Sequence, residues 1–140
     1  MITLVLGPSG SGKTTYMIDK ANAMMKSGNG NIAFIDSDDS QMFSLDHKVR
    51  LINVKSFGIQ SVDRLYGFLA GIIACDYDVQ TIYVDGIYDI MDVGKDLEAL
   101  IENLGRLTEE NHVSVVIGLN LTRGEVPQGE NVQLVELSAD

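Results

Sequence analysis

The sequence predicts an α/β fold, a mostly parallel β-sheet with helices on both faces, formed by all 140 residues as one domain. Three observations predict this fold. Short apolar runs alternate with segments whose apolar residues recur every three or four positions, as in βαβ units. Several of the runs are almost entirely apolar, which is typical of strands buried on both faces. The first run leads into a glycine-rich segment and then into a helical pattern.

Six runs are predicted to be strands, because each is short, rich in β-branched residues or leucine, and followed by turn residues. They are residues 2–7, 31–38, 50–56, 81–86, 113–120 and 131–137. The last of them alternates apolar and polar residues, which suits an edge strand. The polar stretch 36–48 has no regular pattern and is predicted to be a surface loop or a short helix.

Three segments between these runs are predicted to be amphipathic helices. The first begins near Lys13 and stops before Gly28, and its apolar face is Met17, Ile18, Ala21, Met24 and Met25. The second and third have apolar faces within 59–73 and 97–107. Gly67 and Gly71 lie inside the second helix, where each costs about 1 kcal/mol relative to alanine unless it permits close packing.

Composition excludes several classes of function. The net charge of −10 argues against tight binding of nucleic acid. Cys75 is the single cysteine, so neither a disulfide nor a cysteine zinc site can form within the chain, and we expect it to be buried late in a helix. His47 and His112 have no partner at ligand spacing. With no basic leader and no run of about 20 apolar residues, we expect a cytoplasmic protein without a membrane partner.

The glycine-rich segment "GPSGSGKTT" matches the pattern G-x-x-x-x-G-K-[ST] between a predicted strand and a predicted helix. A loop with few Cβ atoms can wrap around phosphate with its N–H groups pointing inward, and the following helix directs its positive dipole end to the same place. Lys13 would reach the β- and γ-phosphates of ATP and is a candidate catalytic residue. The candidate nucleotide-binding residues are Gly7, Pro8, Ser9, Gly10, Ser11, Gly12, Lys13, Thr14 and Thr15.

A magnesium ion bound to the phosphates needs oxygen ligands from the protein. The Thr14 hydroxyl is one candidate ligand. Asp85 is the other, because it ends an apolar strand at the edge where parallel sheets bind their ligands. The alternative is that Asp85 is only a turn residue before Gly86.

Hydrolysis of the nucleotide also needs a group that orients the attacking water. The segment "FIDSDDS" offers Asp36, Asp38 and Asp39 at the end of the second strand, and Asp38 is the preferred base. Asn120 closes a later strand, where its side chain would lie beside the γ-phosphate. The alternatives are a solvated acidic turn and a turn-forming asparagine.

Taken together, these motifs resemble the RecA-like ATPase core of P-loop proteins, which recombinases, replicative helicases of the DnaB type and KaiC-like proteins share. The resemblance covers nearly the whole chain. "GPSGSGKTT" resembles the Walker A motif and "TIYVDG" the Walker B strand. "NIAFIDSDDS" resembles the recombinase strand that ends in "FIDAE", which places Asp38, one carbon shorter, on the catalytic glutamate. "VVIGLNLTRGEV" resembles the strand that ends in a polar sensor, which places Asn120 on that sensor.

The resemblance implies a three-layer fold in which one strand separates the Walker A strand from the Walker B strand. It also implies Mg²⁺-dependent ATP hydrolysis between neighbouring subunits of a ring or filament. Arg123 or Arg106 could then act on the neighbouring subunit's site, although Arg106 has the helical spacing of a surface pair with Glu102 and Glu110. Minimal cores of this kind resemble those encoded by bacteriophages, for which the compartment would be the host cytoplasm.

The function that the resemblance implies is ATP hydrolysis in DNA recombination, repair or replication, with single-stranded DNA as a partner that the acidic charge disfavours. The predicted loops 86–95 and 121–131 carry few basic residues. One alternative is a small nucleotide or metabolite kinase, for which the chain has few arginines and no evident lid other than 36–48. Another is a regulatory or assembly subunit that binds ATP without hydrolysing it.

Overall fold

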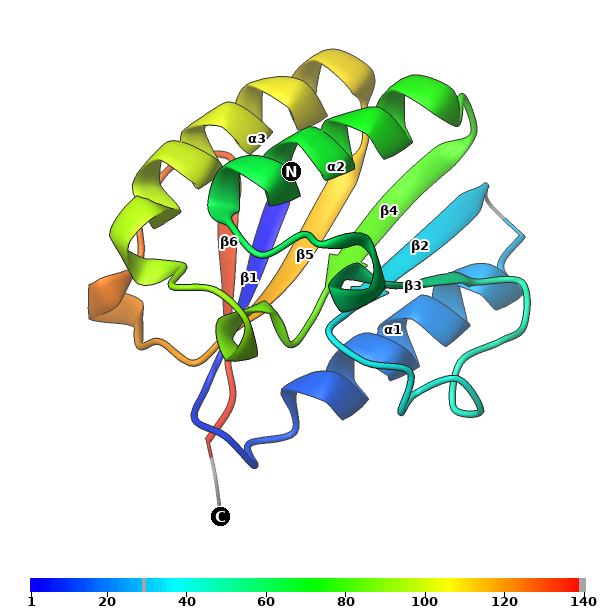
Figure 1. The fold of residues 1–140 in the computed structure, drawn as a ribbon, viewed down its shortest axis with the longest axis horizontal. Coiled ribbons are helices and arrows are strands. Elements are labelled where there is room, and N and C mark those ends of the chain that lie inside the picture. The colour runs from blue at the N-terminus through cyan, green and yellow to red at the C-terminus, as the bar shows by residue number, and fades with distance from the viewer. Residues whose placement is uncertain (29, 139–140) are drawn as a thin grey trace.

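The computed structural model describes residues 1–28 and 30–138, which form a sheet of six strands covered by helices (Figure 1). The strands are β1 (Ile2–Leu6), β2 (Asn31–Asp36), β3 (Arg50–Asn53), β4 (Val79–Val84), β5 (Ser114–Leu119) and β6 (Val132–Glu136). Their order in the sheet is β3-β2-β4-β5-β1-β6, and each neighbouring pair is parallel.

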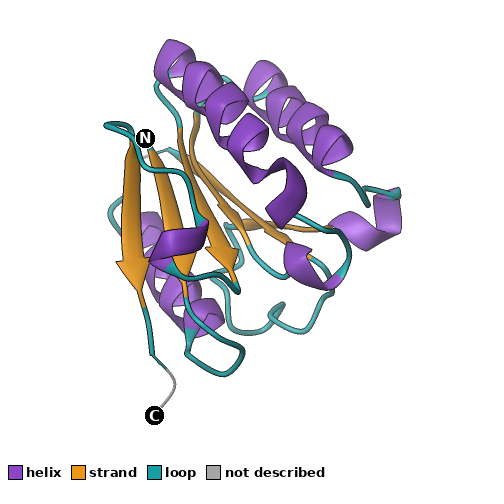
Figure 2. Ribbon diagram, turned by 90° about the vertical axis from the view of Figure 1, so that its left-hand side faces the viewer, coloured by secondary structure: helices purple, strands orange, loops and turns teal. Residues whose placement is uncertain are grey.

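Helices lie on both faces of this sheet (Figure 2). Helix α1 (Lys13–Lys26) covers one face, while α2 (Val62–Cys75) and α3 (Leu97–Asn111) pack side by side on the other. Short 3₁₀ helices follow some of the strands: η1 (Val54–Phe57), η2 (Ile87–Asp89), η3 (Gly94–Asp96) and η4 (Arg123–Glu125). The three-layer α/β fold predicted from the sequence is confirmed.

The core has two halves because successive side chains of a strand point to opposite faces. In β1, Leu4 packs in the cluster under α2 and α3, whereas its neighbour Val5 packs in the cluster under α1. The cluster under α1 also contains Met17, and the rings of Phe34 and Tyr83 stack there at 5.9 Å. Burial on both faces explains why the central strands read as continuous apolar runs.

The strand order agrees with the resemblance noted above. β5 lies between β1 and β4, so one strand separates the strand before the glycine-rich loop from the strand before Asp85. β6 is an edge strand, as its alternating sequence predicts. In a parallel sheet all the carboxyl ends lie along one edge, which is the lower edge in Figure 1. The predicted site residues therefore follow their strands at a common edge.

Two strands end earlier than predicted. β2 ends at Asp36 rather than at residue 38, and β3 ends at Asn53 rather than at residue 56. The Asn53 side chain accepts a hydrogen bond from the N–H of Lys55 and caps η1, which draws the chain away from the sheet. The stretch 37–48 consists of turns and bends, and the Asn22 side chain on α1 hydrogen-bonds to its backbone.

The expectation that Cys75 is buried is wrong: the residue is exposed in the last turn of α2. It lies two residues after Ile73, about 200° around the helix from it, on the side of α2 away from the buried Leu69 and Ile73. Gly67 and Gly71 do not permit close packing either, because a Cβ at either position would have no neighbour within 4 Å.

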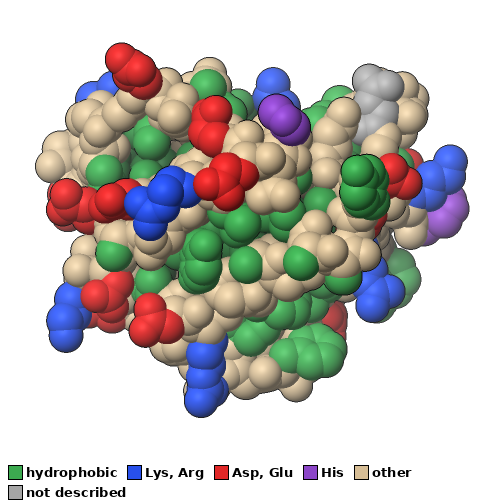
Figure 3. Space-filling model, turned by 90° about the horizontal axis from the view of Figure 1, so that it is seen from above, with side chains coloured by type: hydrophobic (Ala, Val, Ile, Leu, Met, Phe, Trp, Pro, Cys, Tyr) green, Lys and Arg blue, Asp and Glu red, His purple; other side chains and the backbone are tan. Residues whose placement is uncertain are grey.

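Charged side chains of both signs are interspersed on the face opposite the carboxyl edge (Figure 3). The lysines and arginines visible there are scattered rather than gathered into a stripe. None of the helices among the described residues combines the length and apolar character needed to cross a bilayer.

Candidate functional site

The glycine-rich loop between β1 and α1 has a backbone that only glycine adopts without strain. Gly10 and Gly12 have φ of 84° and 94°, in the left-handed region. At Gly7, a Cβ would lie 2.5 Å from Ser11 Oγ and 2.6 Å from the Leu137 carbonyl oxygen, so the position has no room for a side chain. The glycines of the motif are therefore required by the loop itself.

The start of the loop is fixed to the strands on either side. The N–H of Gly7 donates to the carbonyl of Leu119 at 3.3 Å, and the N–H of Leu137 donates to the carbonyl of Leu6 at 2.8 Å. β5 and β6 thus continue to hold the chain as it leaves β1. The loop begins from a rigid base, which is what a precise binding site requires.

The N-terminal end of α1 offers unpaired donors. Among the described residues, the N–H groups of Gly10, Gly12, Lys13 and Thr14 donate to no protein carbonyl. Gly12 precedes the helix and supplies no side-chain cap. Because unpaired N–H groups and the helix dipole favour negative charge, this end of α1 is suited to a phosphate group.

Lys13 is folded back onto the loop and is only 4% exposed. Its Nζ donates to the carbonyl of Gly7 at 2.7 Å and to that of Pro8 at 3.0 Å. Burial lowers the pKa of Lys13, and the negative charges of Asp85 and Asp89 oppose that shift. The ammonium group is therefore held by the carbonyls of its own loop.

Thr14 and Asp85 are in direct contact, although 71 residues separate them in the chain. The Thr14 hydroxyl donates to Asp85 Oδ2 at 2.6 Å. Asp85 is 2% exposed, and its other oxygen, Oδ1, is buried with no hydrogen-bond partner among the described residues. Burial raises the pKa of Asp85, against the opposing effect of the Thr14 hydrogen bond.

This pair fits a magnesium ion. A buried carboxylate oxygen without a partner, beside a hydroxyl, is a hard donor set of the kind that Mg²⁺ prefers. In the part of the chain that the structure describes, no group of three or more His, Cys, Asp or Glu side chains could hold a metal. Mg²⁺ usually takes only one or two protein ligands and completes its shell with water and substrate phosphates.

Asp36 is the acidic residue of "FIDSDDS" that the structure buries most deeply. It is 5% exposed, and its Oδ1 accepts a hydrogen bond from the N–H of Ser37 at 2.7 Å. Burial raises the pKa of Asp36 to about 7, and the negative charges of Asp85 and Asp38 act in the same direction. Sequence reasoning placed Asp36 second to Asp38. Its position as the last residue of an apolar strand was the available signal of burial.

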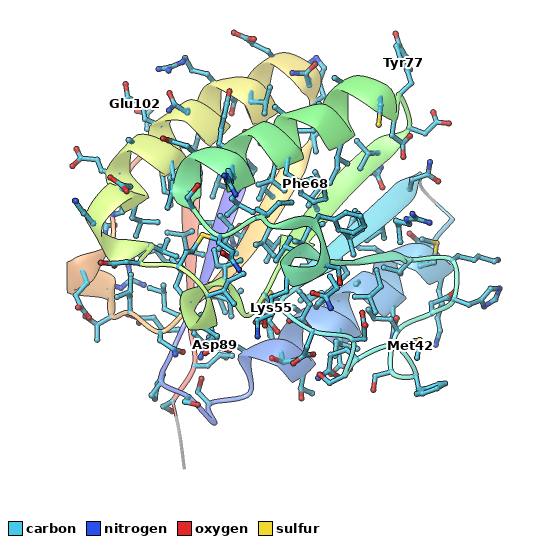
Figure 4. All side chains as sticks on the ribbon, in the orientation of Figure 1. Met42, Lys55, Phe68, Tyr77, Asp89 and Glu102 are labelled. Carbon is cyan, nitrogen blue, oxygen red and sulfur yellow. The ribbon has the colours of Figure 1, made fainter. Side chains whose placement is uncertain are left out.

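Asp38, the predicted base, is exposed two residues beyond the end of β2. Its Oδ1 accepts from the N–H of Ser40 at 2.8 Å, and hydrogen bonds with Ser40 lower the pKa of Asp38. The positive charge of Lys55 contributes in the same direction. Figure 4 shows Lys55 near the centre of the view and Asp89, the last residue of η2, below and to the left of it.

Asn120 and Arg123 lie near the start of the loop. Asn120 is exposed, and both line a groove of about 400 Å³ together with Gly7 and Pro8. Arg123 Nε donates to Glu136 Oε1 at 3.0 Å on the same groove.

Arg106 lies elsewhere, on the exposed surface of α3. Its Nη1 is 3.3 Å from Glu102 Oε1, which is the surface pair that the helical spacing predicts.

The turn after Asp85 contributes a residue that sequence reasoning missed. Gly86 has φ of 71°, and a Cβ there would lie 2.6 Å from Ser37 Oγ and 2.8 Å from Asp36 Oδ1. The chain then enters η2, whose middle residue is Tyr88. The centroid of the Tyr88 ring lies 5.5 Å from Lys13 Nζ, and this is the residue that sequence reasoning missed. The signal in the sequence was an aromatic residue three positions after the carboxylate that ends an apolar strand.

The loop, Lys13, Thr14 and Asp85 thus form one site, with Asp36 and Tyr88 beside it and Asp38 at its exposed margin. No known family model matches this chain, and neither does any curated protein. The geometry and chemistry of the site therefore indicate the class of ligand that suits it. Unpaired N–H groups, a buried ammonium group and a hard oxygen pair are together suited to a polyphosphate with a divalent cation.

Proposed function

We propose that this protein binds ATP with Mg²⁺ and hydrolyses it, as a RecA-like core. The observation that carries the proposal is the 2.6 Å contact between Thr14 and Asp85. A flexible Gly/Ser turn would not bring the hydroxyl that follows Lys13 onto a buried carboxylate two strands away in the sheet. The order β4-β5-β1, with one strand between, supports the same assignment.

Different residues of the site bind the phosphates and the magnesium ion. The N–H groups of Gly10, Gly12, Lys13 and Thr14 hold the phosphates, and Lys13 exchanges the carbonyls of Gly7 and Pro8 for phosphate oxygens. Thr14 and Asp85 would hold the magnesium ion. When bound, that ion neutralises charge on the phosphates and helps to orient them.

Asp38 is the proposed base for the attacking water. Its pKa is lowered, so it is ionised and can accept a hydrogen bond from that water at neutral pH. Asp36, whose pKa is raised to about 7, is the second candidate and can hold a proton close to the metal ligands. Asn120 is proposed to contact the γ-phosphate from the end of β5.

The cellular role follows from the resemblance to RecA-like proteins. We propose that the protein acts in the cytoplasm in DNA recombination, repair or replication, as a ring or filament with Arg123 reaching a neighbouring site. Of the two candidate arginines, Arg123 borders the groove that Gly7 and Pro8 also line. The net charge of −10 favours a DNA contact shared among subunits over tight binding by one chain.

Calorimetry with ATP and Mg²⁺ tests the assignment of the site. Lys13→Ala is expected to remove most of the affinity, whereas Lys26→Ala, at the far end of α1, is the matched control and is expected to bind as the wild type does. Unchanged affinity in Lys13→Ala would contradict the proposal.

Turnover assays test the reaction class. ATP hydrolysis stimulated by single-stranded DNA supports the recombination and replication role. Stimulation by a nucleoside monophosphate with transfer of phosphate to it would instead identify a kinase. Binding without any turnover would leave a regulatory or assembly subunit.

A further inference from the structure

Tyr88 lies over the phosphate-binding lysine because the turn after β4 is firmly held. Gly86 takes a left-handed φ of 71°, which turns the chain sharply after Asp85. Ile87 is completely buried in the core under α2 and α3 and anchors η2. The N–H of Asp89 donates to the Gly86 carbonyl at 3.2 Å and closes the turn. The backbone that carries Tyr88 is thus fixed on both sides of it.

The ring of Tyr88 forms a third contact with the Lys13 ammonium group. Nζ lies 5.5 Å from the ring centroid, in addition to its two hydrogen bonds with the carbonyls of Gly7 and Pro8. A cation this close to an aromatic face is attracted to it, more strongly where water is excluded. Lys13 is 4% exposed and Tyr88 is half-buried, so this contact is largely shielded from solvent.

A second lysine–tyrosine contact in the chain has nearly the same spacing but a different setting. Lys20 Nζ lies 5.6 Å from the centroid of the Tyr16 ring, on α1. Lys20 is exposed and Tyr16 is half-buried, and the two are one helical turn apart on the same helix. The Lys13–Tyr88 contact instead joins the start of α1, which follows β1, to η2, which follows β4. It fixes where a functional side chain lies, which a contact within one helix does not.

We propose that Tyr88 is a positioning residue for Lys13: its ring holds the ammonium group beside the loop while the group exchanges carbonyl oxygens for phosphate oxygens. The inference rests on the proposed nucleotide binding. A free lysine side chain loses rotamer entropy when it is ordered. A contact that orders Lys13 before the nucleotide arrives removes part of that cost from binding.

The ring rather than the hydroxyl carries this role. The attraction arises from the negative face of the aromatic ring, which phenylalanine also has. Burial raises the pKa of Tyr88 to about 12, and the negative charges of Asp85, Asp89 and Asp36 act in the same direction. The hydroxyl therefore stays protonated and adds no charge near Lys13.

Calorimetry on two variants separates ring from hydroxyl. Tyr88→Leu is expected to weaken binding of ATP with Mg²⁺, and of inorganic tripolyphosphate, by about 5- to 30-fold, the range of a shielded cation–π contact. Tyr88→Phe is expected to recover most of that loss. The matched control is Tyr77→Leu, because Tyr77 is fully exposed at the opposite end of the molecule (Figure 4).

Proton NMR provides a readout that does not depend on nucleotide. The ε-methylene protons of Lys13, assigned by their absence in Lys13→Arg, are expected upfield of those of the other lysines because of the Tyr88 ring current. Tyr88→Leu is expected to return them to the ordinary position, and Tyr88→Phe to keep them shifted. A thermal melt of each variant checks that it is folded.

The outcomes distinguish this inference from the proposed function. If Lys13→Ala abolishes ATP binding but Tyr88→Leu binds as tightly as the wild type or more tightly, the positioning role is overturned and the nucleotide site stands. A loss in Tyr88→Phe equal to that in Tyr88→Leu would assign the role to the hydroxyl and also overturn the inference. If Lys13→Ala leaves ATP binding unchanged, the proposed function itself fails.

Discussion

Asp36 and Asp85 are two buried carboxyl groups at the ends of neighbouring strands: burial raises the pKa of Asp36 to about 7, and the charge of Asp85 adds to that shift. Like charges close together in a shielded place disfavour ionisation of one of them. The ionised carboxyl groups of Asp36 and Asp85 thus repel each other, and a divalent cation bound at Asp85 would offset that repulsion.

This relationship predicts a pH dependence of stability. The folded pKa of Asp36 lies above its ordinary value of 3.8, so between about pH 4 and pH 7 the folded state binds more protons than the unfolded state. The free energy of unfolding, measured in urea with EDTA present, is therefore expected to fall as pH rises through this window. Each unit of pKa difference corresponds to about 1.4 kcal/mol.

Asp36→Asn removes this contribution while keeping an acceptor for the Ser37 N–H. The variant is expected to show a shallower loss of stability between pH 4 and pH 7 than the wild type, and to be the more stable of the two at pH 8. Asp39→Asn, an exposed carboxylate in the same segment, is the control. If the free energies of unfolding of Asp36→Asn and the wild type change in parallel with pH, Asp36 does not titrate in this window.

Asp85→Asn is expected to uncouple nucleotide binding from magnesium. The amide oxygen can still accept from the Thr14 hydroxyl, but the charge that would hold the ion is gone. For the wild type, adding Mg²⁺ is expected to tighten ATP binding by about tenfold or more, the scale of effects at metal sites. The affinity of Asp85→Asn for ATP, measured by calorimetry, is expected to be the same with Mg²⁺ as with EDTA. A retained magnesium effect would place the ion elsewhere.

Asp38→Asn is expected to preserve ATP binding and lower turnover by about 10²- to 10⁴-fold, the contribution of a general base. The side chain is exposed and its hydrogen bond comes from the Ser40 backbone, so asparagine can keep the local turn. Steady-state hydrolysis and calorimetry on the same preparation separate kcat from affinity. Full turnover in Asp38→Asn, with a loss in Asp36→Asn, would assign the base to the buried carboxyl group instead.

Gly86→Ala is expected to destabilise the protein by about 2 kcal/mol or more. The new Cβ would be strained by the left-handed φ and would press on Ser37 Oγ and Asp36 Oδ1, which the backbone holds in place. Gly67→Ala is the matched control, because that glycine lies in exposed helix with no neighbour near its Cβ. It is expected to stabilise by about 0.5–1 kcal/mol. Urea unfolding measures both, and a mild effect at Gly86 would show that the turn can rearrange.

Much of this fold could be predicted from local patterns. The runs that became β1 and β5 are almost entirely apolar because both faces of the sheet are covered, and Gly10 and Gly12 of the loop stand where φ is positive. Pairing the loop with Asp85 was predictable too, since strands of one parallel sheet end at one edge. Residue type and order along the chain are sufficient to predict those features.

Other features depend on neighbours that are distant in the sequence. Residues 54–56 look like a continuation of the strand that ends at Asn53, but the Asn53 side chain caps the 3₁₀ helix η1 there instead. The burial of Asp36 and the contact between Tyr88 and Lys13 arise only when three loops meet. Cys75 was misplaced because it lies two residues after the buried Ile73, which is enough to put it on the outer side of the helix.

Two of the three N–H groups of the Lys13 ammonium donate to the Gly7 and Pro8 carbonyls of its own loop. An anion that approached this lysine would compete with those two acceptors. Orthophosphate or a monophosphate offers few oxygens beyond those that the amides take, whereas a polyphosphate chain offers enough for both. If the loop binds nucleotide as proposed, this competition would favour ligands with longer phosphate chains.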